Sequence, residues 1–214
     1  MKSHNNNPPW RLWQRNVIDK FKNLTDEEIK KELQKTANPF AVCMEHWNGD
    51  FNISTMIRNA NAFNAREVFY IGKKRWDRRG AVGTHNYTPP KHLKSYQELI
   101  RLKDRYTIVA VDNNVPNTRN LHTFDWEEIN LPPLMVFGEE GAGLSPDLLR
   151  LSDLVLEIPQ EGSVRSLNVG TSSGVLMYDF VRALKSSTSL YKKLTQPYGE
   201  TDNEQSESCQ LTLL

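Results

Sequence analysis

Short runs of apolar residues alternate with stretches of helical periodicity along most of this 214-residue chain. Apolar runs of strand length that are bounded by turn residues predict buried β-strands. Such strands are predicted over residues 39–45, 67–72, 106–112, 131–138 and 154–159. Because helical stretches separate these strands, the pattern predicts an α/β fold with a mostly parallel sheet and helices on both faces.

The helical stretches carry apolar residues three and four positions apart, which is the spacing of one helix face. Helices are predicted over residues 10–36, 53–63, 95–104, 145–152 and 172–186. Thr25 and Glu28 have the spacing of a capping box. Ser145 followed by Pro146 is typical of a helix start.

The two ends of the chain differ from the middle. Residues 1–36 form a mildly cationic extension that is predicted to be partly helical, and residues 187–214 form a polar tail that is predicted to be disordered. Residues 37–186 remain as one domain of ordinary length. The first residues lack the apolar segment of a secretory signal, and no apolar run approaches the roughly 20 residues of a membrane span.

Composition narrows the classes of function. Hydrophobic residues make up 38% of the chain and charged residues 25%, which is enough for a core. The net charge of +1 means that any nucleic-acid surface must be local. Cys43 and Cys209 are far apart, which argues against a disulfide framework and favours a reducing, cytoplasmic location. The histidines and cysteines lack the spacing of metal ligands, so no metal site is predicted.

Three polar stretches follow predicted strands, and ligands bind at this end of a parallel sheet. The first stretch leads into the helix over 53–63 and contains Asn52 and Arg58. Arg58 lies six residues after Asn52, and this spacing places the two side chains roughly 240° apart around a helix. They converge only if Asn52 lies at or before the helix cap. The alternative is that Asn52 is only a helix cap and Arg58 a solvated charge.

The second stretch, FGEEGAGLSPDLL, begins at residue 137 and has glycines in the reverse of the dinucleotide-binding spacing. The adjacent Glu139 and Glu140 would also repel a pyrophosphate. A ligand with a positive centre, or one held by backbone groups, suits the stretch better than a phosphate. The alternative is a solvated turn.

The third stretch, residues 157–169, places Ser166 and Asn168 on either side of Leu167 just before the last predicted helix. Side-chain and backbone hydrogen-bonding groups therefore alternate there. The alternative is a helix cap followed by a closely packed face of small residues.

Basic residues surround Trp76 in a long loop. Basic groups interleaved with an aromatic ring suit a nucleic-acid backbone with a base stacked nearby. The alternative is a solvated basic loop. The predicted RNA-binding residues are Lys73, Lys74, Arg75, Arg78 and Arg79.

Together, the order and form of the three polar stretches resemble the SpoU/TrmH branch of the SPOUT RNA methyltransferases. The first family motif corresponds to Asn52, Arg58 and Phe63. The second, F-G-x-E-x-x-G-L, corresponds to Phe137, Gly138, Glu140, Gly143 and Leu144. The third, I-P-x-x-G-x-x-x-S-L-N-V, corresponds to Ile158, Pro159, Gly162, Ser166, Leu167, Asn168 and Val169.

The resemblance covers residues 37–185, with two departures. Gln160 stands where the family often has Met, and residues 170–174 read GTSSG in place of a more usual Ser/Ala-rich run. Both departures keep small or polar character. A further likeness, of residues 75–85 to a loop in members that act on the D-loop of tRNA, favours tRNA as substrate.

The resemblance implies a SPOUT fold whose C-terminal part is tied in a trefoil knot. It implies S-adenosylmethionine as methyl donor, and a ribose 2′-hydroxyl of tRNA or rRNA as acceptor. It also implies a homodimer that shares its active site across the interface.

The resemblance also assigns roles to residues. Arg58 would assist deprotonation of the 2′-hydroxyl with the support of Asn52, and Ser166 and Asn168 would position the ribose. Glu140 joins this catalytic set by shaping the second knot loop. Cofactor binding falls to Gly138, Ile158, Leu167 and Val111. An arginine is a poor base because of its high pKa, so Arg58 as base and Arg58 as stabiliser of the developing alkoxide both stay open.

Two other functions remain as alternatives to a methyltransferase. One is a non-catalytic RNA-binding protein on the same fold, against which Asn52, Arg58, Ser166 and Asn168 count. The other is a nucleotide-dependent oxidoreductase, against which the glycine spacing and the Glu139–Glu140 pair count.

Overall fold

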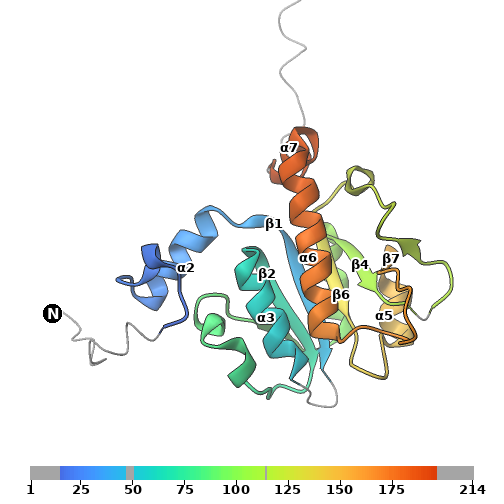
Figure 1. Ribbon diagram of the computed structural model, residues 1–214, viewed down its shortest axis with the longest axis horizontal. Helices are drawn as coiled ribbons and strands as arrows, with labels where there is room; N and C mark the ends of the chain where they lie inside the picture. Colours follow the sequence, from blue (N-terminus) through green and yellow to red (C-terminus); the bar gives the residue numbers. More distant parts are fainter. Residues whose placement is uncertain (1–14, 47–50, 114, 197–214) are drawn as a thin grey trace, which may run out of the picture.

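The computed structural model describes residues 15–46, 51–113 and 115–196, and a parallel β-sheet lies at its centre (Figure 1). The seven strands of this sheet have the order β3-β2-β1-β6-β4-β7-β5, and each neighbouring pair is parallel. The strands are β1 (Asn38–His46), β2 (Ala65–Gly72), β3 (Lys91–Leu93), β4 (Thr107–Val111), β5 (Arg119–Asn120), β6 (Pro133–Phe137) and β7 (Leu154–Glu157).

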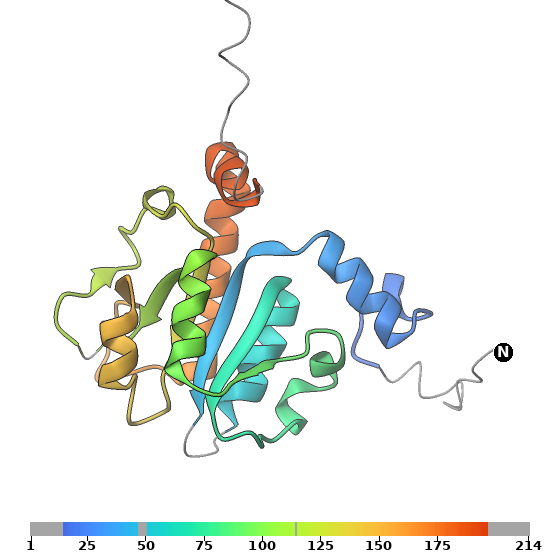
Figure 2. The same cartoon turned by 180° about the vertical axis from the view of Figure 1, so that it is seen from behind.

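Helices cover both faces of the sheet, as the sequence pattern predicts. α3 (Asn52–Ala62) and α6 (Val169–Ser186) lie side by side on the face seen in Figure 1. α4 (Tyr96–Ile100) and α5 (Pro146–Leu151) lie on the opposite face, seen in Figure 2. The remaining helices are α2 (Asp26–Lys35), α7 (Thr188–Thr195) and the 3₁₀ turns Asp19–Phe21, Arg79–Ala81, Thr84–Asn86, Arg101–Asp104 and Trp126–Glu128.

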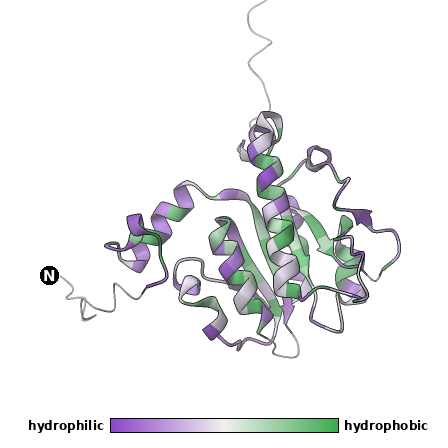
Figure 3. Ribbon diagram, in the orientation of Figure 1, coloured by the Kyte–Doolittle hydropathy of each residue, from purple (hydrophilic) through white to green (hydrophobic). Residues whose placement is uncertain are grey.

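The apolar strands divide their side chains between two cores. In β1, Val42 and Met44 pack on the α3/α6 side, whereas Ala41 and Cys43 pack on the α4/α5 side. This period of two, with both faces buried, explains why the strands read as continuous apolar runs (Figure 3). Cys43 is a free, buried thiol, and Cys209 lies outside the described residues.

The prediction of a disordered tail from residue 187 is wrong for its first part, because Thr188–Thr195 forms helix α7. Leu190 and Leu194 lie one helical turn apart and are only 1% and 2% exposed. The Ser187 hydroxyl caps the helix by accepting a hydrogen bond of 3.1 Å from the Leu190 N–H. The prediction missed this apolar pair because the segment around it is polar in composition. The rest of the predicted tail, from residue 197, lies outside the described residues.

The N-terminal extension is helical only in part within the described residues. Its capping box is present, with the Thr25 N–H donating to Glu28 at 2.8 Å and the Glu28 N–H donating to the Thr25 hydroxyl at 3.3 Å. Ile29 of α2 is buried, which attaches this helix to the core domain. The predicted helical residues 10–14 lie outside the described part of the chain.

Short elements account for the other differences between prediction and structure. β3 and β5 were not predicted, because strands of three and two residues are too short to show a hydrophobic pattern.

Among the described helices, none is both long and apolar enough to cross a membrane.

Candidate active site

The three polar stretches lie at the carboxyl ends of the central strands, as expected. β1 pairs with β6, and β4 lies between β6 and β7. The chain runs outward from β1 to β3 on one side and then crosses to β4 on the other, so the direction of winding reverses near β1 and β6. Ligands of open parallel sheets bind at such a reversal.

Asn52, Glu140 and Asn168 come together at this point, although they are far apart in the sequence. Asn52 and Asn168 each donate an Nδ2 hydrogen bond to Glu140 Oε2, at 2.8 Å and 2.9 Å. Asn168 Nδ2 also donates a hydrogen bond of 2.9 Å to Asn52 Oδ1. The cluster therefore joins the first turn of α3, the loop after β6 and the residue that precedes α6.

Asn168 is also the N-cap of α6. Its Oδ1 accepts a hydrogen bond of 3.2 Å from the Thr171 N–H, so the cap and the polar cluster use opposite ends of one amide. The cap interpretation of this residue is therefore correct but incomplete. In the first turn that follows, a Cβ at Gly170 would lie 2.8 Å from the Thr55 side chain, so this glycine allows α6 to approach α3 closely.

The glycines after β6 close a tight turn rather than cradle a phosphate. A Cβ at Gly138 would lie 2.2 Å from the backbone of Gly143, so only glycine fits there. Glu139 and Gly143 exchange two backbone hydrogen bonds of 3.1 Å and 2.9 Å, and Gly143 has a φ of 70°. This turn presents Glu140 to the cluster.

A pocket beside the cluster contains most of the residues that were predicted to bind a cofactor. Val111, Gly138 and Leu167 line it, together with Ser166 and Gln160. Ile158 is placed differently, because the Asn113 amide engages its backbone: Nδ2 donates to the Ile158 carbonyl at 2.7 Å, and Oδ1 accepts from its N–H at 3.2 Å. Ile158 thus helps to anchor the end of β7 to the residues after β4.

Arg58 lies apart from the polar cluster within one chain. It is exposed on α3, nearly two turns after Asn52, which is the first residue of that helix. In the described part of the chain its guanidinium forms no ion pair. The angular separation of about 240° is therefore realised, and Arg58 points away from the face that carries Asn52.

The basic loop packs against the start of α3 and so lies next to the cluster. Ser54 donates a hydrogen bond to the Asp77 carbonyl, and the Arg79 guanidinium lies 5.4 Å from the Phe51 ring centroid. Arg79 pairs with Asp77 at 2.6 Å, and its hydrogen bonds lower the pKa of that carboxyl. All five predicted RNA-binding residues, Lys73, Lys74, Arg75, Arg78 and Arg79, are exposed.

The Trp76 ring packs against other side chains of the same chain. It packs against the α3/α6 core, with the His85 ring edge-on at 5.7 Å and Arg78 at 5.9 Å from its ring. Burial lowers the pKa of His85, and the charge of Arg78 lowers it further. The positive charges around this loop are therefore presented to solvent, whereas the tryptophan that they surround is half-buried.

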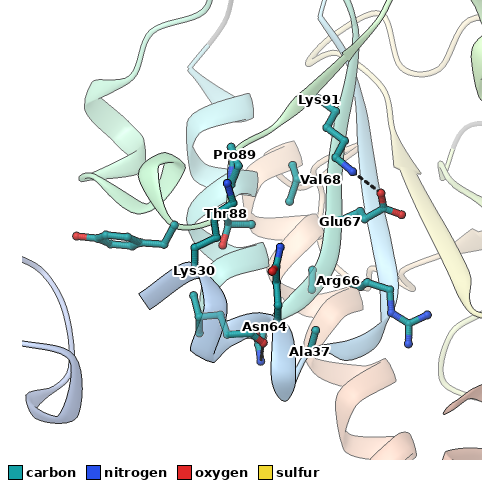
Figure 4. A pocket seen from close by; sticks show the side chains of 13 residues that line it. Lys30, Ala37, Asn64, Arg66, Glu67, Val68, Thr88, Pro89 and Lys91 are labelled. Carbon is teal, nitrogen blue, oxygen red and sulfur yellow. Dashed lines mark hydrogen bonds and ion pairs between the residues drawn. The ribbon is translucent and has the colours of Figure 1, made fainter. Parts of the chain in front are cut away.

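A second cavity, of about 310 Å³, lies where α2 meets β2 (Figure 4). Its polar groups serve the fold: Lys91 pairs with Glu67 at 2.6 Å, and Asn64 Nδ2 donates to the Thr36 carbonyl at 2.9 Å. The cavity lies near the start of β2, whereas the polar cluster lies at the carboxyl ends of the strands. It is therefore separate from the candidate site.

Comparison with known proteins decides the family. Residues 39–178 match the SpoU rRNA Methylase family. The chain belongs to this family. The match confirms the resemblance drawn from the three motifs, and all of the polar cluster lies inside it. Within the described residues no group of three or more histidines, cysteines, aspartates or glutamates is placed to hold a metal ion.

Individual relatives from bacteria agree with the family assignment. A tRNA (guanosine(18)-2′-O)-methyltransferase of Borreliella burgdorferi is 30% identical over 80% of each chain. The enzyme of the same name from Aquifex aeolicus is 25% identical over 73% of this chain and 75% of its own.

Solved structures support the fold. The TrmH/SpoU tRNA modifying enzyme of A. aeolicus superposes with a TM-score of 0.65 at 21% identity, over 82% of this chain and 91% of that one. The SpoU methyltransferase AviRb of Streptomyces viridochromogenes, in complex with AdoMet, has a TM-score of 0.61 at 24% identity, over 69% and 61% of the two chains.

Asp112 and Asn113 are the site residues that sequence reasoning missed. Asp112 lines the pocket and accepts a hydrogen bond of 3.2 Å from the Leu144 N–H, which holds the turn after β6. Asp112 is the last residue of the strand predicted over 106–112 and Asn113 directly follows it, which was the available signal. No motif marked them, because their partners lie more than 30 residues away in sequence.

Proposed function

We propose that this protein transfers a methyl group from S-adenosylmethionine to a ribose 2′-hydroxyl of tRNA or rRNA. The observation that carries the proposal is the cluster of Asn52, Glu140 and Asn168, in which one residue from each family motif meets the other two. Family membership supports the reaction class. The names of the relatives support guanosine in tRNA, and relatives named for 23S rRNA keep rRNA as a second substrate class.

The pocket next to the cluster suits the cofactor in its chemistry. Val111, Leu167 and the backbone around Gly138 offer apolar walls and peptide groups to a nucleoside. Gln160 Oε1 is buried there without a hydrogen-bond partner in the described part of the chain, so a ligand that carries a donor would satisfy it. The enclosed volume is about 90 Å³, so a nucleoside-sized ligand would extend beyond it.

The proposed reaction depends mainly on positioning. S-Adenosylmethionine supplies an electrophilic methyl group on a sulfonium. A 2′-hydroxyl is a weak nucleophile, so the protein must orient it and help its proton to leave as the new bond forms. Asn52, Glu140 and Asn168 are joined by hydrogen bonds, and Ser166 is exposed at the pocket beside them, where a ribose can reach it.

We propose that Arg58 completes the site of a homodimer, in which each site takes residues from both subunits. Its exposure and its distance from the cluster in one chain support this sharing. The nearby surface of α6 also carries exposed apolar side chains: Val175 is 37% exposed and Tyr178 is 60% exposed. Tyr178 lies 6.4 Å from Phe63, just past the end of α3, so this surface continues onto the α3 side.

The basic loop is the proposed RNA contact. Its Arg79 lies beside Phe51 at the start of α3, and Ser54 of the same helix donates to the loop at Asp77, so an RNA backbone bound to this loop would pass close to Asn52. The guanosine of the tRNA D-loop is the proposed target, and the cytoplasm the proposed location.

A trefoil knot is the proposed topology of the C-terminal half. β6 is inserted between β1 and β4, and Gln160, Ser166 and Leu167 line one pocket together with residues of the loop after β4 and of the turn after β6. This arrangement supports a chain that threads through the preceding loop. An experimental chain trace in which residues 160–186 do not thread would remove the knot from the proposal.

Substitution of Arg58 tests the catalytic proposal. We expect Arg58→Ala to lower methyl transfer to tRNA at least about 100-fold, because the developing alkoxide loses its cation. Cofactor binding, measured by calorimetry, should not change. Arg101→Ala is the matched control, since Arg101 is exposed and follows α4 on the opposite face.

Three outcomes separate the alternatives. Unchanged turnover in Arg58→Ala contradicts the role of this residue. RNA binding by the wild-type protein without methyl transfer favours a non-catalytic binding protein. Binding of a nicotinamide cofactor but not of S-adenosylmethionine contradicts the methyltransferase and favours an oxidoreductase.

A further inference from the structure

Gln160 follows the end of β7 and is held in place by its neighbours. The Asn113 side-chain amide forms hydrogen bonds with the carbonyl and the N–H of Ile158, at 2.7 Å and 3.2 Å. Pro159 restricts the backbone between Ile158 and Gln160. The segment that carries Gln160 is therefore anchored to the loop after β4. Gln160 lines the pocket from this anchored position.

The carboxamide of Gln160 is incompletely satisfied. Its Oε1 is buried and has no hydrogen-bond partner among the described residues. A buried carbonyl oxygen without a donor destabilises a protein, so its persistence in a pocket points to a ligand that supplies the donor. In place of Gln160, a methionine would fill similar space without any hydrogen-bonding demand.

The other walls of the pocket indicate which part of a nucleoside lies near Gln160. Val111, Phe137, Leu167 and Val169 form an apolar part of the lining, and Asp112, Glu140, Ser166 and Ser172 form a polar part. Apolar walls suit a flat base better than a ribose with two hydroxyls. A glutamine carboxamide is complementary to an adenine edge, since it can accept from the amine and donate to the adjacent ring nitrogen.

We propose that Gln160 accepts a hydrogen bond from the adenine amine of the cofactor and so determines selectivity for the base. This inference rests on the proposed function, because it assumes S-adenosylmethionine in this pocket. It adds a side-chain contact to a site whose other predicted cofactor residues, Gly138, Leu167 and Val111, offer only backbone groups and apolar side chains.

The test is a binding cycle that needs no turnover. Calorimetry on the full chain compares S-adenosylhomocysteine with its analogue that carries hydrogen in place of the 6-amine, for the wild type and for Gln160→Met. We expect the wild type to prefer the amine about tenfold, and Gln160→Met to lose most of this preference. Gln97→Met is the matched control, because Gln97 is exposed on α4 on the other face of the sheet.

The thermal midpoint of the free protein provides a second measurement. Gln160→Met removes an unsatisfied buried acceptor, so the midpoint should stay the same or rise. A fall in the midpoint, together with an unchanged preference for the amine, would show a structural role instead.

Each outcome has a distinct meaning. An equal preference in the wild type and in Gln160→Met overturns the inference. If Gln160→Met instead keeps the preference for the amine but loses a wild-type preference for S-adenosylhomocysteine over its 2′-deoxyribose analogue, the contact belongs to the ribose and the inference is overturned. Failure of the wild type to bind S-adenosylhomocysteine at all would instead refute the proposed function.

Discussion

Asn168 carries two structural duties with the two ends of one side chain. Its Oδ1 caps α6 through the Thr171 N–H, and its Nδ2 donates to Glu140 and Asn52. The cap fixes where the helix begins, so it also fixes where the amide nitrogen points. Local helix stability and the geometry of the cluster are therefore linked through this residue.

Two substitutions of Asn168 should separate these duties. Asn168→Ala removes both, and we expect the free energy of unfolding to fall by about 1 kcal/mol through loss of the cap. Asn168→Ser keeps a good cap, so its stability should stay near that of the wild type. Methyl transfer should fall about 100-fold in both, because neither side chain can hold Glu140 and Asn52 in place. Urea unfolding and turnover measure the two effects.

Activity near the wild-type level in Asn168→Ser would contradict the role of the amide. It would show that α6 needs only a capped start, and that Glu140 and Asn52 keep their positions without the third member.

At the scale of elements, α7 shows how an apolar pair secures a segment that is polar in composition. Leu190 and Leu194 enter the α3/α6 core, and Lys193 Nζ donates to the Glu127 carbonyl at 2.6 Å. This contact ties α7 to the 3₁₀ turn Trp126–Glu128, whose Trp126 donates to Asp179 of α6 at 2.8 Å. α7 is thus part of the folded domain.

Truncation of the buried leucine tests this placement. Leu190→Ala should lower the free energy of unfolding by about 2–4 kcal/mol, because the fully buried side chain leaves a cavity. Lys192→Ala is the control on the exposed side of the same helix and should change stability by less than about 0.5 kcal/mol. Equal, small effects of the two substitutions would show that α7 does not pack in solution.

At the scale of the whole molecule, the proposed catalytic residues lie in two separate places. One chain brings Asn52, Glu140 and Asn168 together but leaves Arg58 exposed on another face of α3. A two-fold symmetric dimer can combine the cluster of one subunit with an arginine of the other.

Mixing two inactive variants tests whether the site is shared. Arg58→Ala keeps the cluster, and Asn168→Ser keeps the arginine. After subunit exchange, half of the dimers are mixed and each holds one intact site, so methyl transfer should recover to about a quarter of the wild-type level. Light scattering tests for the dimer, and exchange without recovery, or a stable and active monomer, would contradict the shared site.

Much of the fold could be predicted because it depends on local pattern. The apolar runs predicted the five longer strands, and the Thr25–Glu28 spacing predicted a capping box that is present. The candidate site could be predicted only in part from the sequence. The motifs marked Asn52, Glu140 and Asn168 one by one, whereas the Asn113–Ile158 contact joins residues 45 positions apart without a motif.

Strand length, helix caps and buried faces followed from neighbouring residues, because backbone sterics and side-chain periodicity act over a few positions. Tertiary packing decided the rest. It set β4 between β6 and β7, brought three distant amide and carboxylate groups within hydrogen-bonding distance, and left Arg58 apart from them. Such contacts depend on the sum of many weak interactions across the whole chain, and no short stretch of sequence contains that sum.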